Sequence, residues 1–216
     1  HMVFKGTKNI PDPTKLSAVI EDVGGLINAS TDYDSTNYWI TIPQAHTSNG
    51  LTLLFDMLSN SLFESQSIET ERTVIAEEIN SVSDYPDARC ELNLQKIMWP
   101  GTYLERDIAG SKETLSSITR SDLIQFSKNN HNCSKIIVSV AGNIDTESVT
   151  SSVAELSSQL PYLKEQNITS SQNIKPESGQ THSEKTDTEQ MHVFLGYPGA
   201  SANEEAKYAM CLINLI

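Results

Sequence analysis

The fold is decided by residues 68–82, IETERTVIAEEINSV. Apolar residues at helical spacing predict a helix, one face of which carries Ile68, Glu71, Ile75, Glu78 and Val82. Two carboxylates therefore stand two turns apart on a stripe that should be apolar. Burying a carboxylate is costly unless a metal ion, an arginine, a lysine or water meets it. The alternative is a tilted stripe with both glutamates at a solvent-exposed edge, because glutamate is rarely fully buried.

Size and composition indicate a globular chain of one to two domains. It has 216 residues, of which 38% are hydrophobic and 20% charged. The formal net charge of −13 argues against nucleic-acid binding as the main role, and no apolar run has membrane-spanning length. The cysteines, Cys90, Cys133 and Cys211, form no CxxC pair. We therefore expect a reducing compartment, without a disulfide framework or a cysteine zinc site.

Periodicity and turn signals predict an α+β chain. The expected helices cover residues 15–23, 44–62, 68–82, 87–98, 119–130 and 146–160, with another opening at residue 201. Residues 26–31 and 36–42 read as the strands of a β-hairpin. The near-continuous apolar run 135–141 predicts a strand buried on both faces, and residues 191–196 predict a further strand.

A change in composition divides the chain. Residues 164–190 are polar and rich in Ser, Thr, Gln, Asn and Glu, which is typical of a mobile linker. We therefore expect a first subdomain at residues 1–162, a linker at 163–189 and the start of a second subdomain at 190–216. Because the last segment stops inside an apolar helical run, we expect the chain to be a fragment.

Five motifs, taken in order, resemble one family: the inverzincin zinc metallopeptidases, which include pitrilysin, insulinase and the mitochondrial processing peptidases. The motifs lie at residues 1–7 (HMVFKGT), 26–31 (LINAST), 71–79 (ERTVIAEEI), 141–145 (AGNID) and 196–199 (GYPG). The first resembles the segment that completes the family's H-x-x-E-H motif, and the third resembles its E-R-x-V-I-x-x-E-I helix. The resemblance implies a mixed, mostly antiparallel sheet with helices packed on one side.

The resemblance also implies a zinc site. Residues 2–77, 76 in all, separate His1 from Glu78, which is the spacing between the second motif histidine and the distal glutamate ligand in the processing peptidases. It implies His1 and Glu78 as ligands of Zn²⁺, and Glu71 as a residue that supports catalysis. Glu77, the rival ligand, lies about 100° around the helix. Alternatively, His1-Met2 comes from a cloning site, in which case His1 has no such role.

The implied reaction is peptide hydrolysis by metal-activated water. Zinc with three protein ligands keeps an open position for water, lowers its pKa and polarises the scissile carbonyl. Asn28, Ala29 and Ser30 lie on the segment that resembles the family's substrate-edge strand, where they would hold a peptide as an added strand. A local polar role beside the turn is the alternative for Asn28.

The family's first motif histidine and its general-base glutamate would precede His1. We therefore expect this chain to be inactive by itself and to need a second homologous half, as a fused domain or partner chain, to enclose a peptide or unfolded polypeptide. The alternative functions are a non-catalytic partner or scaffold subunit of the same family and, third, an acidic adaptor without metal. Neither nucleic acid nor a membrane is expected as a partner. A bacterial cytoplasm is the favoured location, and the mitochondrial matrix or another organelle is the alternative.

Overall fold

The computed structural model describes residues 1–163, 174–185, 187, 189–201 and 203–213. The chain forms two compact units, one made of residues 1–77 with 111–168 and the other of residues 78–110 with 169–216. We call them the first and the second unit. The subdomain boundaries predicted at residues 162 and 190 stay predictions. Residues 164–173 of the predicted linker lie outside the described residues.

A β-hairpin forms the sheet of the first unit, as the sequence predicted. β1 (Leu26–Thr31) pairs with β2 (Thr36–Thr41) in antiparallel register, so that Leu26 faces Thr41 and Thr31 faces Thr36. Gly25 precedes β1 where the chain passes close to the helix before it. A Cβ at Gly25 would lie 2.8 Å from both the Thr41 carbonyl oxygen and an Ile20 methyl carbon, so this approach requires glycine.

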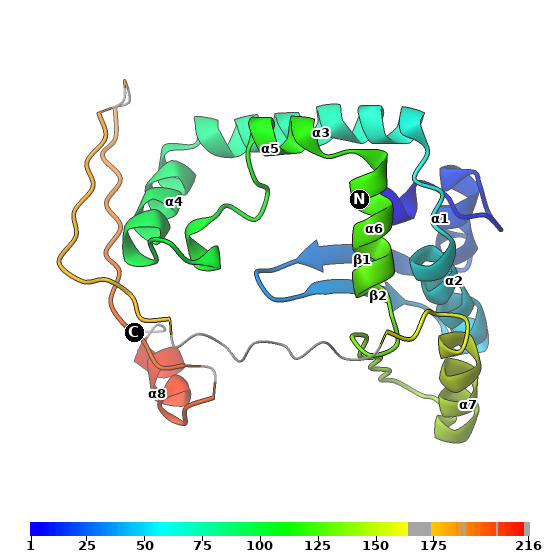
Figure 1. The fold of residues 1–216 in the computed structure, drawn as a ribbon. Coiled ribbons are helices and arrows are strands. Elements are labelled where there is room, and N and C mark those ends of the chain that lie inside the picture. Colours follow the sequence, from blue (N-terminus) through cyan, green and yellow to red (C-terminus); the bar gives the residue numbers. More distant parts are fainter. Residues whose placement is uncertain (164–173, 186, 188, 202, 214–216) are drawn as a thin grey trace. The chain divides into compact units, whose positions relative to one another are not determined.

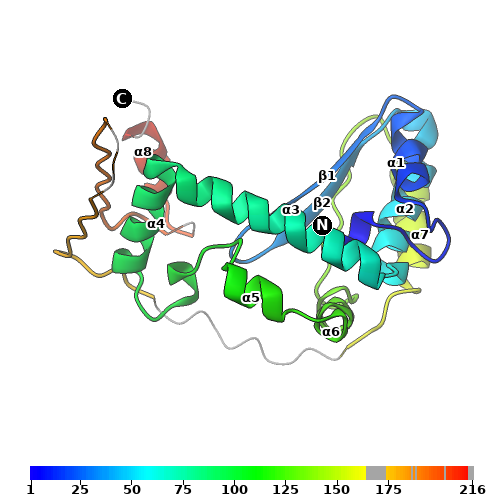
Figure 2. The same cartoon turned by 90° about the horizontal axis from the view of Figure 1, so that it is seen from above.

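Helices pack beside the hairpin and, together with it, enclose the core of the first unit. α1 (Pro13–Glu21) and α2 (Thr47–Asn60) both contact the hairpin, and α2 also contacts α1 and α7 (Thr146–Ser157) (Figures 1 and 2). The core also takes in the short 3-10 helix η1 (Met2–Phe4). The buried apolar side chains at its centre are Val3, Leu16, Ile20, Leu53 and Met57.

Side-chain caps start the helices α6 (Arg120–Asn130) and α7 where the sequence predicted them. The Thr119 side chain accepts a hydrogen bond from the Asp122 N–H, and Asp145 accepts one from Ser148. The six-residue helix α5 (Lys112–Ser117) was not predicted. It begins with a capping box, in which Ser111 and Thr114 each accept a hydrogen bond from the other's backbone N–H. A further 3-10 helix, η2 (Gln44–His46), leads into α2.

α3 (Ser65–Asp84) is one continuous helix that begins in the first unit and ends in the second. The second unit continues with α4 (Pro86–Met98), η3 (Tyr103–Glu105) and α8 (Ala206–Ile213). The polar segment contacts α4: the Glu177 N–H donates to the Met98 carbonyl at 2.8 Å, and Arg89 pairs with Glu184. Among the described residues, no helix combines the length and apolarity needed to cross a bilayer.

Two predicted strands are wrong. Residues 135–141 form no strand, and Ile137 is 94% exposed rather than buried. Residues 191–196 also form no strand, and Val193 and Leu195 are exposed. A strand needs backbone partners on a neighbouring strand. Within the described ranges the sheet is the β1–β2 hairpin alone, and neither segment pairs with it.

Leu16→Ala is expected to lower the free energy of unfolding by about 2–5 kcal/mol, because it leaves a cavity in the core. Leu16 is fully buried at 0% exposure, whereas Leu26 is 63% exposed. Leu26→Ala is the matched control, with an expected change within about 0.5 kcal/mol. Urea unfolding followed by circular dichroism measures both, and equal losses would contradict this core.

Candidate functional site

The first residues of the chain form a compact turn on the first unit. The Phe4 N–H donates to the His1 carbonyl and the Lys5 N–H to the Met2 carbonyl, each at 3.1 Å. Gly6 then adopts a φ of +106°, where a Cβ would lie 2.3 Å from the Pro11 carbonyl oxygen. Together with the buried Val3, these contacts hold His1 and Lys5 at one place.

Glu71 of α3 meets both of these residues. Its side chain is buried, with the whole residue only 5% exposed. His1 Nδ1 lies 2.9 Å from Glu71 Oε2, and Lys5 Nζ lies 2.5 Å from Glu71 Oε1. Glu71 is therefore a buried carboxylate, and Lys5 and His1 are the groups that contact it.

The pKa of Glu71 is set by opposing effects. Burial alone would raise this pKa, but the hydrogen bonds and charges of Lys5 and His1 together outweigh burial. The pKa of Glu71 therefore lies below its ordinary value, and its side chain is a carboxylate at neutral pH. A buried carboxylate held in this way can orient an imidazole beside it.

Glu78 lies two turns further along α3 and is exposed. The buried stripe continues through Ile79 instead. At 100° per residue, Glu78 stands about 80° from Ile68, at the edge of the stripe. The solvent-exposed alternative thus holds for Glu78 but not for Glu71. Glu78 belongs to the second unit, and its role as a zinc ligand stays a prediction.

The substrate residues predicted on β1 lie on a strand that pairs on one side. Asn28 and Ser30 are exposed, and Ala29 is half-buried. In the described part of the chain, β2 is the partner strand of β1, and Asn28 of β1 lies opposite Trp39 of β2. Asn28 Oδ1 also accepts a hydrogen bond from the Ala29 N–H at 2.8 Å. Both interpretations of Asn28, as a peptide contact and as a local polar residue, therefore stay open.

Sequence reasoning missed two polar contacts of this region. Lys5 was not predicted as a partner of Glu71, because no spacing rule links residue 5 to residue 71. Arg72 follows Glu71 and binds α5 and the residue after it instead: its Nη1 donates to the Leu115 carbonyl within α5, and its Nη2 donates to the Ile118 carbonyl at 2.9 Å. Arg72 thereby ties α3 to the α5–α6 segment.

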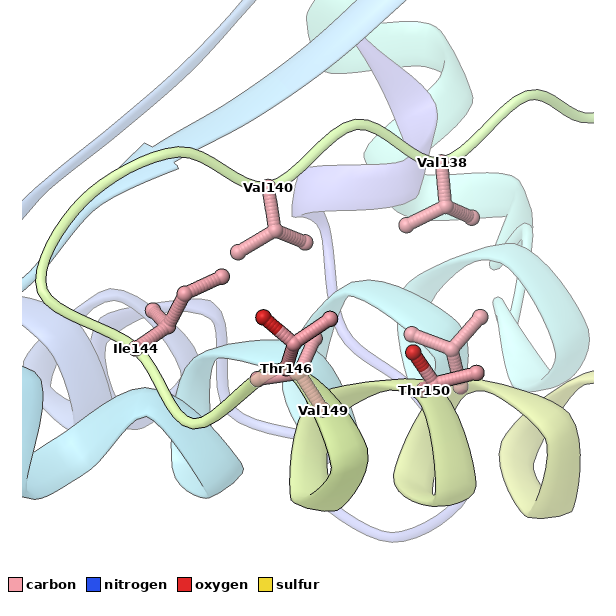
Figure 3. A pocket seen from close by; sticks show the side chains of 7 residues that line it. Val138, Val140, Ile144, Thr146, Val149 and Thr150 are labelled. Carbon is pink, nitrogen blue, oxygen red and sulfur yellow. The ribbon is translucent and has the colours of Figure 1, made fainter.

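A hollow of about 300 Å³ lies elsewhere in the first unit. Figure 3 shows Val138 and Val140 pointing towards α7 across this hollow. Its lining consists of Val138, Val140, Ile144, Thr146, Val149, Thr150 and Val153. These side chains include two hydroxyls but no carboxylate, imidazole, amine or thiol.

Two family models divide the chain between them. The model described as Insulinase (Peptidase family M16) matches residues 1–112, and that described as Peptidase M16 inactive domain matches residues 117–216. The chain belongs to peptidase family M16. The resemblance inferred from the five sequence motifs is therefore confirmed.

Curated M16 relatives include mitochondrial and bacterial proteins. The mitochondrial-processing peptidase subunit beta of Dictyostelium discoideum is 32% identical over 155 residues, which cover 72% of this chain and 33% of that protein. An uncharacterized zinc protease of Rickettsia felis is 30% identical over 217 residues, which cover 100% of this chain and 52% of that protein. The chain thus spans about half or less of these relatives.

Solved structures show the same fold. A protease from Helicobacter pylori matches with a TM-score of 0.74 at 22% identity, over 82% of this chain and 42% of that one. Pitrilysin matches with a TM-score of 0.66 at 19% identity, over 75% of this chain and 18% of that one. The α+β fold class predicted from the sequence is confirmed.

Glu71→Gln is expected to lower the free energy of unfolding at neutral pH by about 1.5–3 kcal/mol, because it removes the charge from two charge-assisted hydrogen bonds. The pKa of Glu71 is lower in the folded protein than in the unfolded chain. Its contribution is therefore complete above the unfolded-state pKa and is lost as the pH falls through the folded-state pKa. Urea unfolding should show the gap between wild type and variant closing towards acid pH.

Glu69→Gln is the matched control on the same helix. Glu69 is exposed and pairs with Arg72 at 3.3 Å, so its loss should cost less than about 1 kcal/mol. A gap for Glu71→Gln that does not change with pH would contradict the assignment.

Proposed function

We propose that this chain is part of a zinc-dependent metalloendopeptidase, in which His1 and Glu78 are zinc ligands and Glu71 supports His1. The observation that carries the proposal is the 2.9 Å contact between His1 Nδ1 and the buried Glu71 carboxylate. Metal-binding histidines commonly hold a carboxylate with the ring nitrogen that does not bind the metal. Relatives of this chain are named zinc proteases.

The chemistry of His1 fits this role. When Nδ1 carries the proton and donates it to Glu71, the lone pair of the imidazole is on Nε2, which is the form that a metal requires. The depressed pKa of Glu71 keeps the accepting group ionised at neutral pH. Zinc, when bound, lowers the pKa of a water molecule and polarises the scissile carbonyl.

His1 and Glu78 account for two of the three protein ligands of a catalytic zinc ion. Within the ranges that the structure describes, no three His, Cys, Asp or Glu side chains gather as a possible metal site. The proposal therefore requires the family motif's other histidine, and its general-base glutamate, from outside these 216 residues. The 216-residue chain alone is then expected to be inactive.

The proposed substrate is a peptide or an unfolded polypeptide. The side of β1 that faces away from β2, at Asn28, Ala29 and Ser30, would receive it as an added strand, which reads backbone groups and tolerates many sequences. A second homologous half would enclose the substrate. In support, this chain covers only 33% and 52% of two relatives, and one of them is named a beta subunit.

A bacterial cytoplasm is the proposed location. The match to the Rickettsia zinc protease covers 100% of this chain, whereas the match to the Dictyostelium mitochondrial subunit covers 72% of this chain. The mitochondrial matrix remains the alternative, since processing peptidase subunits are also relatives. The alternative function is a non-catalytic partner subunit, with which the inactive-domain match over residues 117–216 is compatible.

Glu78→Gln in the full-length protein is expected to abolish stoichiometric zinc and to lower peptidase activity by at least about 100-fold, because a neutral amide is a much poorer zinc ligand than a carboxylate. Metal analysis after dialysis and cleavage of an unfolded polypeptide measure the two effects. Glu77 is the neighbouring residue and is also exposed, and Glu77→Gln should retain both the zinc and the peptidase activity. Full activity in Glu78→Gln would contradict the proposal, and wild-type protein with neither zinc nor activity would favour the non-catalytic subunit.

A further inference from the structure

A second buried carboxylate lies beside the chain segment that follows His1. Asp56, on α2, is only 9% exposed. Its oxygens accept hydrogen bonds from three neutral side chains: Thr7 Oγ1 at 2.5 Å, Asn9 Nδ2 at 2.6 Å and Asn60 Nδ2 at 2.8 Å. A buried carboxylate is costly unless donors meet it, so these contacts fix the groups around Asp56.

Thr7 is the central donor of this group. It is fully buried, and its hydroxyl accepts a hydrogen bond from the Ile10 N–H at 2.9 Å while donating to Asp56. The Thr7 N–H in turn donates to the Ile10 carbonyl at 2.9 Å. Asp56 therefore locks the turn at residues 7–10 in one conformation.

The same turn is joined to the chain that leads into α3. The Leu62 N–H donates to the Gly6 carbonyl at 3.1 Å, and the Lys8 N–H donates to the Asn60 carbonyl at 3.0 Å. Thr7 and Ser61 form an antiparallel bridge. One of these paired segments follows His1 and Lys5, and the other precedes the helix that carries Glu71. The positions of His1 and Lys5 and the position of Glu71 therefore depend on the same backbone contacts, which join residues 6–8 to residues 60–62.

We propose that Asp56 is a positioning residue: through Thr7 it fixes where His1 and Lys5 meet Glu71. Both of its carboxylate oxygens accept hydrogen bonds, so it acts through Thr7 and not as a ligand. Its consequence for zinc rests on the proposed function, because a metal ligand tolerates displacements of only about 0.5 Å. The effect of Asp56 on the geometry of residues 1–7 does not depend on the proposed function.

Variants at Thr7 test the proposal with the least risk to the fold, because Asp56 also holds Asn60. Thr7→Val keeps the volume and removes the hydroxyl, so that Asp56 loses a donor, whereas Thr7→Ser keeps the hydroxyl. Thr52→Val makes the same chemical change at an exposed site of α2 and is the matched control. All are made in the full-length protein, and circular dichroism checks that they are folded.

Hydrogen exchange of the Phe4 and Lys5 amides is the readout that needs no metal. Thr7→Val should make both exchange at least about 10-fold faster, because the turn that supports them opens locally. Thr7→Ser and Thr52→Val should stay within about 3-fold of the wild type. If Phe4 and Lys5 exchange at the wild-type rate in folded Thr7→Val, the positioning role is wrong.

Zinc affinity, measured by competition with a chelator, is the second readout. Thr7→Val should bind zinc about 10-fold more weakly than the wild type and Thr7→Ser. Equal affinity in Thr7→Val would overturn the positioning of His1 as a ligand. A full-length wild type that binds no zinc would refute the proposed function, whereas the exchange of Phe4 and Lys5 would still decide the role of Asp56.

Discussion

The carboxylate of Glu71 is the constraint on which the first unit depends. It is buried and ionised, so the fold has to deliver positive partners to it. Those partners, His1 and Lys5, come from the other end of a loop of about 70 residues. The apolar core that contains Val3 supplies the burial that offsets the entropy of closing such a loop.

Two buried carboxylates in this chain have different surroundings and different consequences. Asp56 is met by a hydroxyl and two amides, which are neutral donors that fix a turn and the start of the next segment. Glu71 is met by the ammonium of Lys5 and the imidazole of His1. The first arrangement fixes a backbone turn, and the second holds two side chains from the start of the chain against α3. The backbone hydrogen bonds between residues 6–8 and 60–62 connect the Asp56 site to the Glu71 site.

Local signals predicted the helices and the hairpin well, because caps, turn residues and periodicity act within a few residues. Thr119 and Asp145 cap the helices that were predicted at residues 119–130 and 146–160. The strands expected at residues 135–141 and 191–196 were wrong because an apolar run does not say whether a neighbouring strand is present. The helix α5 was missed because its six residues hold too little periodicity to be recognised.

The sequence by itself determined that one helix carries Glu71 and Glu78 two turns apart, that a β-hairpin precedes it, and that the motifs belong to a metallopeptidase family. These properties depend on residues close together in the chain or on motif order. The tertiary structure alone decided that Glu71 is buried whereas Glu78 is exposed, that Lys5 and His1 both contact Glu71, and that Asp56 holds the turn after them. Burial and charge pairing depend on which distant segments pack together, and helical spacing carries no information about that.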